Sequence, residues 1–238
     1  MHFFTFRRTV LGTICFILLA VLLGAAEGDI TDHFGEGKIG TVVSGILLAL
    51  IGLTNFRIWQ VRRSGQPFRL SAPENLWLLL SVAFFFLFLD ESFQIHEAMD
   101  QTIHRITGIT ETAVTDRIDD LIILAYGLIG VAILFFYRHE VTRIPGLVPF
   151  MVAAFALTVL QTGFDALSNG NELLTWFGLP EGLAESLYNW ANIAEEALKL
   201  LAEAALLAGF AHALRYLRGG SPRNAAPEER SNETARME

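Results

Sequence analysis

Residues 76–89 read LWLLLSVAFFFLFL, and the residues that follow, 90–104, read DESFQIHEAMDQTIH. The first stretch is almost wholly apolar, as expected for a helix that crosses a bilayer core and needs about 20 residues to do so. The second stretch is rich in carboxylates and contains two histidines. The contrast predicts a membrane-spanning helix that ends either in a solvated turn or in a chemical site.

The same pattern recurs along the chain, which has 238 residues, 53% of them hydrophobic and only 18% charged. This composition is too apolar for an ordinary soluble domain. We therefore predict an all-α, polytopic membrane protein with one helical transmembrane domain, residues 1–218. The polar tail, residues 219–238, is expected to be disordered and cytoplasmic. The six predicted spans are Thr9–Ala26, Ile39–Trp59, Leu76–Ile95, Asp120–Tyr137, Leu147–Ala166 and Ala191–Leu214.

The orientation follows from the basic residues in the short connections, which favour the cytoplasmic side. One side collects Arg7, Arg8, Arg62, Arg63, Arg69, Arg138, Arg143, Arg215, Arg218 and Arg223. The other side has only Lys38, Arg105 and Arg117. We therefore expect both termini in the cytoplasm and a bacterial-type inner (plasma) membrane.

The first span has a second interpretation. Its start, MHFFTFRR, and its end at Gly24-Ala25-Ala26 are also typical of a cleaved secretory signal. Cleavage would leave five spans and would not change the orientation of the others.

Composition also excludes some functions. A formal net charge of -8 argues against a nucleic-acid partner. Cys15 is the single cysteine, which excludes an intrachain disulfide and a cysteine-based metal site. The lipid bilayer is the expected partner, and the oligomeric state cannot be derived from these features.

Most of the 25 acidic residues fall on the side predicted to be outer, which should concentrate cations there. Projected as one continuous helix, the third span places Asp90, Glu97 and His104 on one face. His96, Asp100 and His104 form an adjoining row at i, i+4 and i+8. Such a row could bind a divalent metal such as zinc, iron or manganese, with Glu97 or Asp90 transferring protons.

The sixth span carries a similar stripe. Glu196, Lys199 and Glu203 share one face of the predicted helix, and Glu203 falls near the middle of the membrane. Lys199 is flanked by Glu195, Glu196 and Glu203, so it can be paired within a buried charge network. A carboxylate at that depth needs a partner or a proton.

The fourth and fifth spans also present acids at the same side. If spans three to six form a polar-cored bundle, carboxylates and histidines from four helices converge, as in metal sites of helical bundles. The predicted metal ligands are His96, Asp100, His104, Asp120, Asp165 and Glu196. The plainer alternative is that these residues are solvated helix ends or acids that complement helix dipoles.

Three functions remain open. The first is a metal-dependent membrane hydrolase that acts on a lipid or another amphiphile from the outer side. The second is a transporter or channel for a small cation or a proton. The third is a structural or partner-binding protein whose charges hold the bundle together. The cytoplasmic halves offer few polar groups, chiefly Thr54, Asn55, Ser81 and His212, which favours a one-sided site over a conduit.

Overall fold

The computed structural model of the protein describes residues 6–35, 37–65, 67, 69–108, 118–168 and 179–219, without the side chains of residues 118–120, 166–168 and 181. Within these ranges every regular element is an α-helix. The helices are α1 (Phe6–Glu27), α2 (Ile39–Arg63), α3 (Asn75–Phe93), α4 (Ile95–Thr107), α5 (Ile118–Phe136), α6 (Arg138–Thr142), α7 (Leu147–Ser168) and α9 (Glu181–Arg218).

Five of these helices, α1, α2, α3, α7 and α9, are long and apolar enough to cross a membrane, and α5 contributes a shorter apolar segment, Leu121–Phe136. The prediction of a multi-pass helical membrane protein is thereby confirmed. Residues 220–238 of the tail lie outside the described residues.

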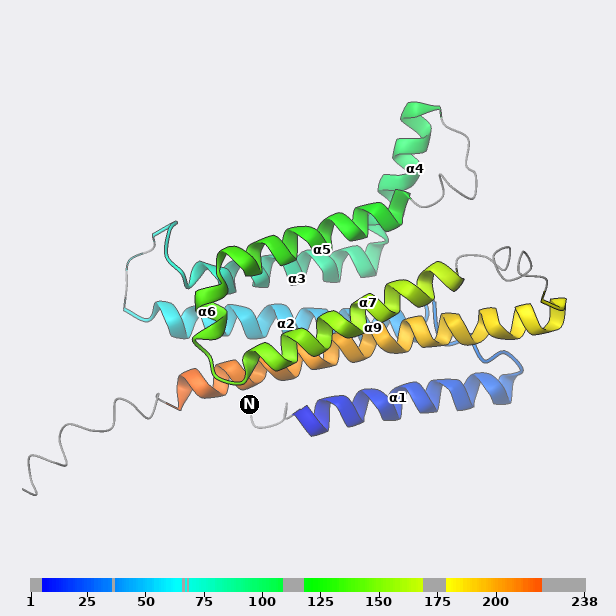
Figure 1. The fold of residues 1–238 in the computed structure, drawn as a ribbon, viewed down its shortest axis with the longest axis horizontal. Helices are drawn as coiled ribbons and strands as arrows, with labels where there is room; N and C mark the ends of the chain where they lie inside the picture. Colours follow the sequence, from blue (N-terminus) through cyan, green and yellow to red (C-terminus); the bar gives the residue numbers. More distant parts are fainter. Residues whose placement is uncertain are drawn as a thin grey trace, which may run out of the picture.

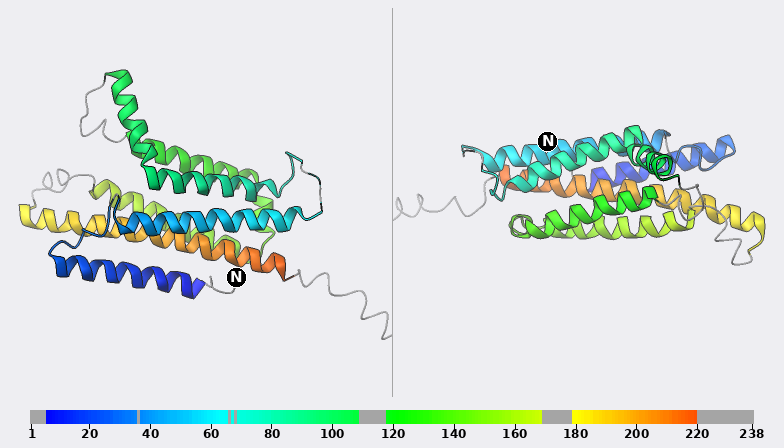
Figure 2. Two further views of the ribbon diagram at one scale, coloured as in Figure 1. Left: turned by 180° about the vertical axis from the view of Figure 1, so that it is seen from behind. Right: turned by 90° about the horizontal axis from the view of Figure 1, so that it is seen from above.

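The long helices run side by side (Figure 1). α9 is the central element, because it packs against α1, α2 and α7, while α3 packs against α2 and α5 contacts α3, α4 and α6. α4 turns away from the direction of the bundle in both figures (Figures 1 and 2). The first turn of α1 and the last turn of α9 lie at the same end, as an even number of spans requires.

The core lies between α2, α3 and α9. Ile51, Ile58, Trp77 and Phe210 are fully buried there, and the rings of Trp77 and Phe210 meet edge to face at 6.2 Å. The outward faces of α1, α5 and α7 instead expose large apolar side chains, among them Leu22, Leu128 and Phe155. Apolar side chains around a packed core fit a bilayer environment.

α9 is longer than the predicted span Ala191–Leu214. Its 38 residues correspond to about 57 Å at 1.5 Å per residue, well beyond the roughly 30 Å of a hydrocarbon core. Its first turns therefore extend past the membrane, where Glu185 is exposed.

α3 ends two residues before the end of the third predicted span, Leu76–Ile95. α3 stops at Phe93, Gln94 adopts a left-handed conformation (φ 51°, ψ 47°), and α4 begins at Ile95. Gln94 is the one non-glycine residue of the described chain with a positive φ. Because the helix is interrupted there, the stripe predicted across residues 90–104 is divided between two helices, with Asp90 on α3 and Glu97 and His104 on α4.

Gly209 allows α7 and α9 to pack closely. A Cβ at Gly209 would lie 2.7 Å from the Cβ of Phe150, so we expect Gly209→Ala to destabilise the protein by about 1–3 kcal/mol through overpacking. Gly163→Ala on α7 is the matched control, because a Cβ there meets nothing within 4 Å. Chemical unfolding in mild detergent measures both; equal stability of the two variants would contradict the close packing.

Candidate functional site

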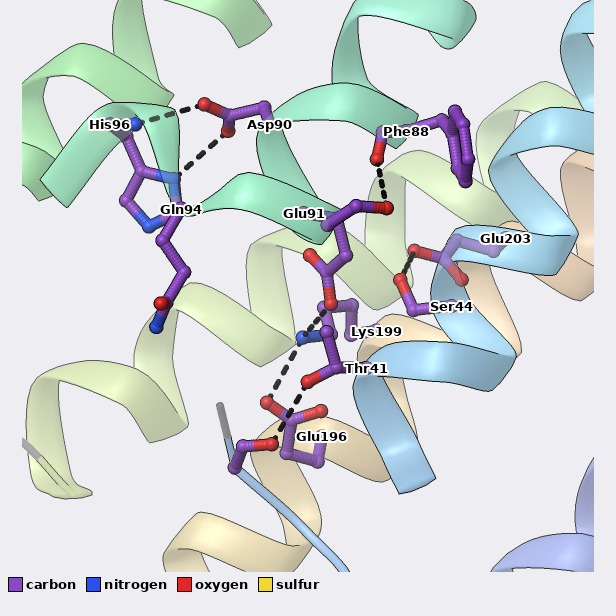
Figure 3. Close-up of polar contacts among 12 residues, drawn as sticks. Thr41, Ser44, Phe88, Asp90, Glu91, Gln94, His96, Glu196, Lys199 and Glu203 are labelled. Atoms are coloured by element: carbon purple, nitrogen blue, oxygen red, sulfur yellow. Dashed lines mark hydrogen bonds and ion pairs between the residues drawn. The ribbon is translucent and has the colours of Figure 1, made fainter. Parts of the chain in front are cut away.

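The junction of α3 and α4 is built around Asp90. Its Oδ1 accepts the backbone N–H of His96 at 2.9 Å, and its Oδ2 lies 2.9 Å from His96 Nδ1 (Figure 3). In a continuous helix this N–H would bond the carbonyl four residues earlier, so the buried carboxylate replaces the helical bond at the break. The carboxylate also orients the imidazole and leaves Nε2 as the ring nitrogen that Asp90 does not contact.

The predicted metal row on α4 is divided into two pairs. His96 contacts Asp90, whereas His104 Nε2 lies 3.3 Å from Oδ1 of the buried Asp100. Glu97, predicted to move protons, accepts a hydrogen bond from the Gln94 amide at 3.1 Å.

Another group has the geometry of a metal site. Within the described ranges, the His, Asp and Glu ligand atoms that gather in threes within 4.8 Å belong to Glu27, Asp32 and His33. The predicted ligands His96, Asp100, His104, Asp165 and Glu196 form no such group in the part of the chain that the structure describes. The side chain of Asp120 lies outside the described residues, and metal binding by this set stays a prediction.

The Glu27 group lies at the α1–α2 connection. Lys38 donates to Asp32 Oδ1 at 2.8 Å, and this hydrogen bond and the charge of Asp32 raise the pKa of Lys38. Hydrogen bonds from the side chain and backbone of Thr31 lower the pKa of Asp29. The connection is thus held together by its own polar contacts.

Lys199 is the centre of a second cluster, at the meeting of α3 and α9. Its Nζ donates to Glu91 Oε1 at 3.1 Å and to Glu196 Oε1 at 3.0 Å (Figure 3). The predicted pairing of Lys199 with Glu196 is present in the structure. Glu195 is half-buried on α9, and Asp165 is half-buried near the end of α7.

Glu203 extends the cluster deeper into the bundle. Ser44 of α2 donates to Glu203 Oε1 at 2.7 Å. The other oxygen of Glu203, Oε2, is sealed from solvent and has no hydrogen-bond partner, and the same holds for Glu196 Oε2. Both residues are buried, each with an exposed fraction of 7%. We call Ser44, Glu91, Glu196, Lys199 and Glu203 the carboxylate cluster.

The α1–α2 connection lies directly beside the carboxylate cluster. A Cβ at Gly40 would lie 3.3 Å from the carbonyl oxygen of His33 and 3.8 Å from Glu196 Oε2. Thr41 Oγ1 donates to the carbonyl of Gly35 at 3.0 Å (Figure 3). The connection therefore covers Glu196 at this end of the bundle.

Sequence reasoning missed Glu91 and Ser44. Glu91 follows Asp90 in the chain, and only Asp90 falls on the predicted stripe. Ser44 lies in an apolar span, but Gly40, Gly45 and Gly52 on the same helix are a signal, because small residues allow close helix packing in membranes. Phe88 and Phe85 of α3 lie against Gly45 and Gly52.

The opposite end of the bundle holds a third cluster. Arg62 Nε and Nη2 donate to the two carboxylate oxygens of Glu140 at 2.6 and 3.0 Å, and Trp77 Nε1 donates to Oε1 at 3.1 Å. Between the two ends, Asn55 is buried with its Oδ1 unpartnered, and Ser81 donates to the carbonyl of Gly52. The few polar groups of this half are thus enclosed in the bundle.

A model of a family described as a domain of unknown function (DUF8692) matches residues 29–214. The chain belongs to this family. The match contains every member of the carboxylate cluster, whereas Glu27 of the metal-like group precedes it. Neither the curated proteins nor the solved structures yield a match to the chain.

Proposed function

We propose that this membrane protein takes up a small cation, a metal ion or a proton, from the outer side into the carboxylate cluster, as a transporter or channel would. The observation that carries the proposal is the charge imbalance of the cluster. Three carboxyl groups, Glu91, Glu196 and Glu203, surround one ammonium group, Lys199. Uncompensated carboxylates are costly inside a membrane, so the cluster favours an additional positive charge.

The burial of the two orphaned oxygens supports the proposal. Most buried polar groups in proteins are hydrogen-bonded, and a role in helix packing is then enough to account for them. Glu196 Oε2 and Glu203 Oε2 are buried and have no partner. A bound cation would satisfy acceptors of this kind, and the partly exposed Glu91 and Lys199, at 18% and 23%, mark a side from which it could enter.

The polar groups beyond Glu203 support passage rather than a closed end. Asn55 of α2 and Ser81 of α3 lie buried between Ser44 and the Arg62–Glu140 pair. The sequence favoured a one-sided site because the cytoplasmic halves hold few polar groups. The buried Asn55 and Ser81 lead us to propose passage instead.

Flux through proteoliposomes tests the proposal. The full chain should pass a cation gradient, and Glu203→Gln should reduce the flux to that of protein-free liposomes, because the amide cannot hold a cation by charge. Glu185→Gln, on the exposed start of α9, is the matched control and should keep the flux. Equal flux in Glu203→Gln and the unmodified chain would remove Glu203 from the mechanism.

A metal-dependent hydrolase is the second candidate, and the Asp90–His96 pair favours it. Metal-binding and catalytic histidines commonly hold one ring nitrogen against a carboxylate and use the other. Here Asp90 contacts Nδ1, so Nε2 would bind a metal or accept a proton.

Elemental analysis of protein purified without chelator or polyhistidine tag separates the metal sites. A transition metal lost in His96→Ala would support the hydrolase, whereas a metal lost only in His33→Ala would assign it to the Glu27 group. A metal-free protein would contradict a metal-dependent hydrolase.

A further inference from the structure

The ligand atoms of the carboxylate cluster are not gathered as a metal ion requires. Divalent and alkali cations are held by several oxygen ligands at once. Yet no three His, Asp or Glu ligand atoms within the described residues gather there within 4.8 Å; those that do belong to the Glu27 group. Glu203 Oε2 and Glu196 Oε2 are also closed to solvent. A proton needs one oxygen and no added space.

We infer that the cation taken up is a proton held by Glu203, and that Lys199 is the internal counter-ion that replaces it. The inference rests on the proposed function and names the cation that the site accepts. The charged groups close enough to act on Glu203 are Lys199 and Glu196 from α9 and Glu91 from α3, while α2 presents Ser44. With a proton on Glu203, Lys199 faces only two carboxylates.

The Lys199 side chain can move from Glu91 and Glu196 to Glu203 without a change in the backbone. Glu196 precedes it by three residues and Glu203 follows it by four, and both spacings bring side chains together on one helix face. A lysine ammonium is a point charge with three donors on a flexible stem. It can therefore leave Glu91 and move one helical turn to Glu203.

Proton transfer follows from this exchange. The O–H bond of Glu203 breaks, and its proton forms a new O–H bond on Glu91, whose carboxylate Lys199 has just left. The charge of the cluster is unchanged in this step, since Glu203 becomes negative as Glu91 becomes neutral. Glu91, 18% exposed, then releases the proton to water. Uptake from the outer side runs in the reverse order, with Glu91 as the first acceptor, and flux across the membrane requires onward release from Glu203 along the buried polar groups Asn55 and Ser81.

Proteoliposomes of the full chain test the inference in two arms. In the first, a pH step is applied while potassium and valinomycin hold the membrane potential, and a pH dye reports proton flux. In the second, a sodium or potassium gradient is applied at constant pH. We expect proton flux in the first arm and no sodium or potassium flux in the second. The proton flux should be lost in Glu203→Gln and kept in Glu185→Gln.

Lys199→Met should also lose proton flux, because nothing then replaces the departing proton. If this variant does not fold, Lys199→Met with Glu196→Gln removes one charge of each sign and serves instead. Proton flux that persists without Lys199 would overturn its role as counter-ion. Sodium or potassium flux lost in Glu203→Gln, without proton flux, would overturn the proton and leave the proposed function standing. No flux of any cation would overturn both.

Discussion

Replacing Glu140 by alanine is expected to destabilise the protein by about 3–5 kcal/mol, because removal of one partner leaves a buried charge uncompensated. Glu140 is 3% exposed and is the shared acceptor of Arg62 and Trp77. These residues come from α2, α3 and α6, so one carboxylate joins three elements. Equilibrium unfolding in detergent, followed by circular dichroism, measures the change.

Two further variants serve as a control and as a conservative substitution. His139→Ala changes the exposed neighbour on α6 and should leave stability unchanged. Glu140→Gln keeps one acceptor and should lie between Glu140→Ala and the unmodified protein. A Glu140→Ala variant as stable as His139→Ala would show that the pair does not secure this end of the bundle.

Lys199→Met is expected to destabilise the protein by a similar amount, about 3–5 kcal/mol, because the carboxylates of Glu91 and Glu196 lose their counter-ion. Glu203→Gln should be neutral or slightly stabilising, since the amide is uncharged like the protonated carboxyl group and can still accept from Ser44. The same unfolding measurement compares the two variants.

The comparison separates a functional from a purely structural cluster. If the charges only hold the helices together, Glu203→Gln should cost stability as Lys199→Met does. Stability retained in Glu203→Gln, together with lost flux, would show that Glu203 serves the cation and not the fold. A large loss of stability in Glu203→Gln would favour the structural interpretation.

The fold could be predicted because the bilayer limits the choice of structure. Backbone groups in lipid must be hydrogen-bonded internally, so long apolar runs such as residues 76–89 indicate helices from length alone. The break at Gln94 could not be predicted in this way. Neither glycine nor proline marks it, and it depends on Asp90 reaching the backbone of His96, a contact between residues six apart.

Three of the five members of the carboxylate cluster followed from spacing on one helix. Glu196, Lys199 and Glu203 share a face of α9 because they lie three and four residues apart. Glu91 and Ser44 come from α3 and α2, and their approach depends on how three helices pack, which spacing within a helix does not contain. The predicted ligands of α4 lie in two separate pairs for a related reason, since His96 contacts Asp90 across the helix break and His104 contacts Asp100 on its own helix.

The central claim is that Glu203 holds the proton of the cluster, and infrared spectroscopy tests it most directly. A neutral carboxylic acid absorbs apart from a carboxylate, and its band shifts in D₂O. We expect such a band in the unmodified protein near neutral pH, its loss in Glu203→Gln, and its persistence in Glu185→Gln. An unmodified protein without the band, or a band that survives in Glu203→Gln, would contradict the account.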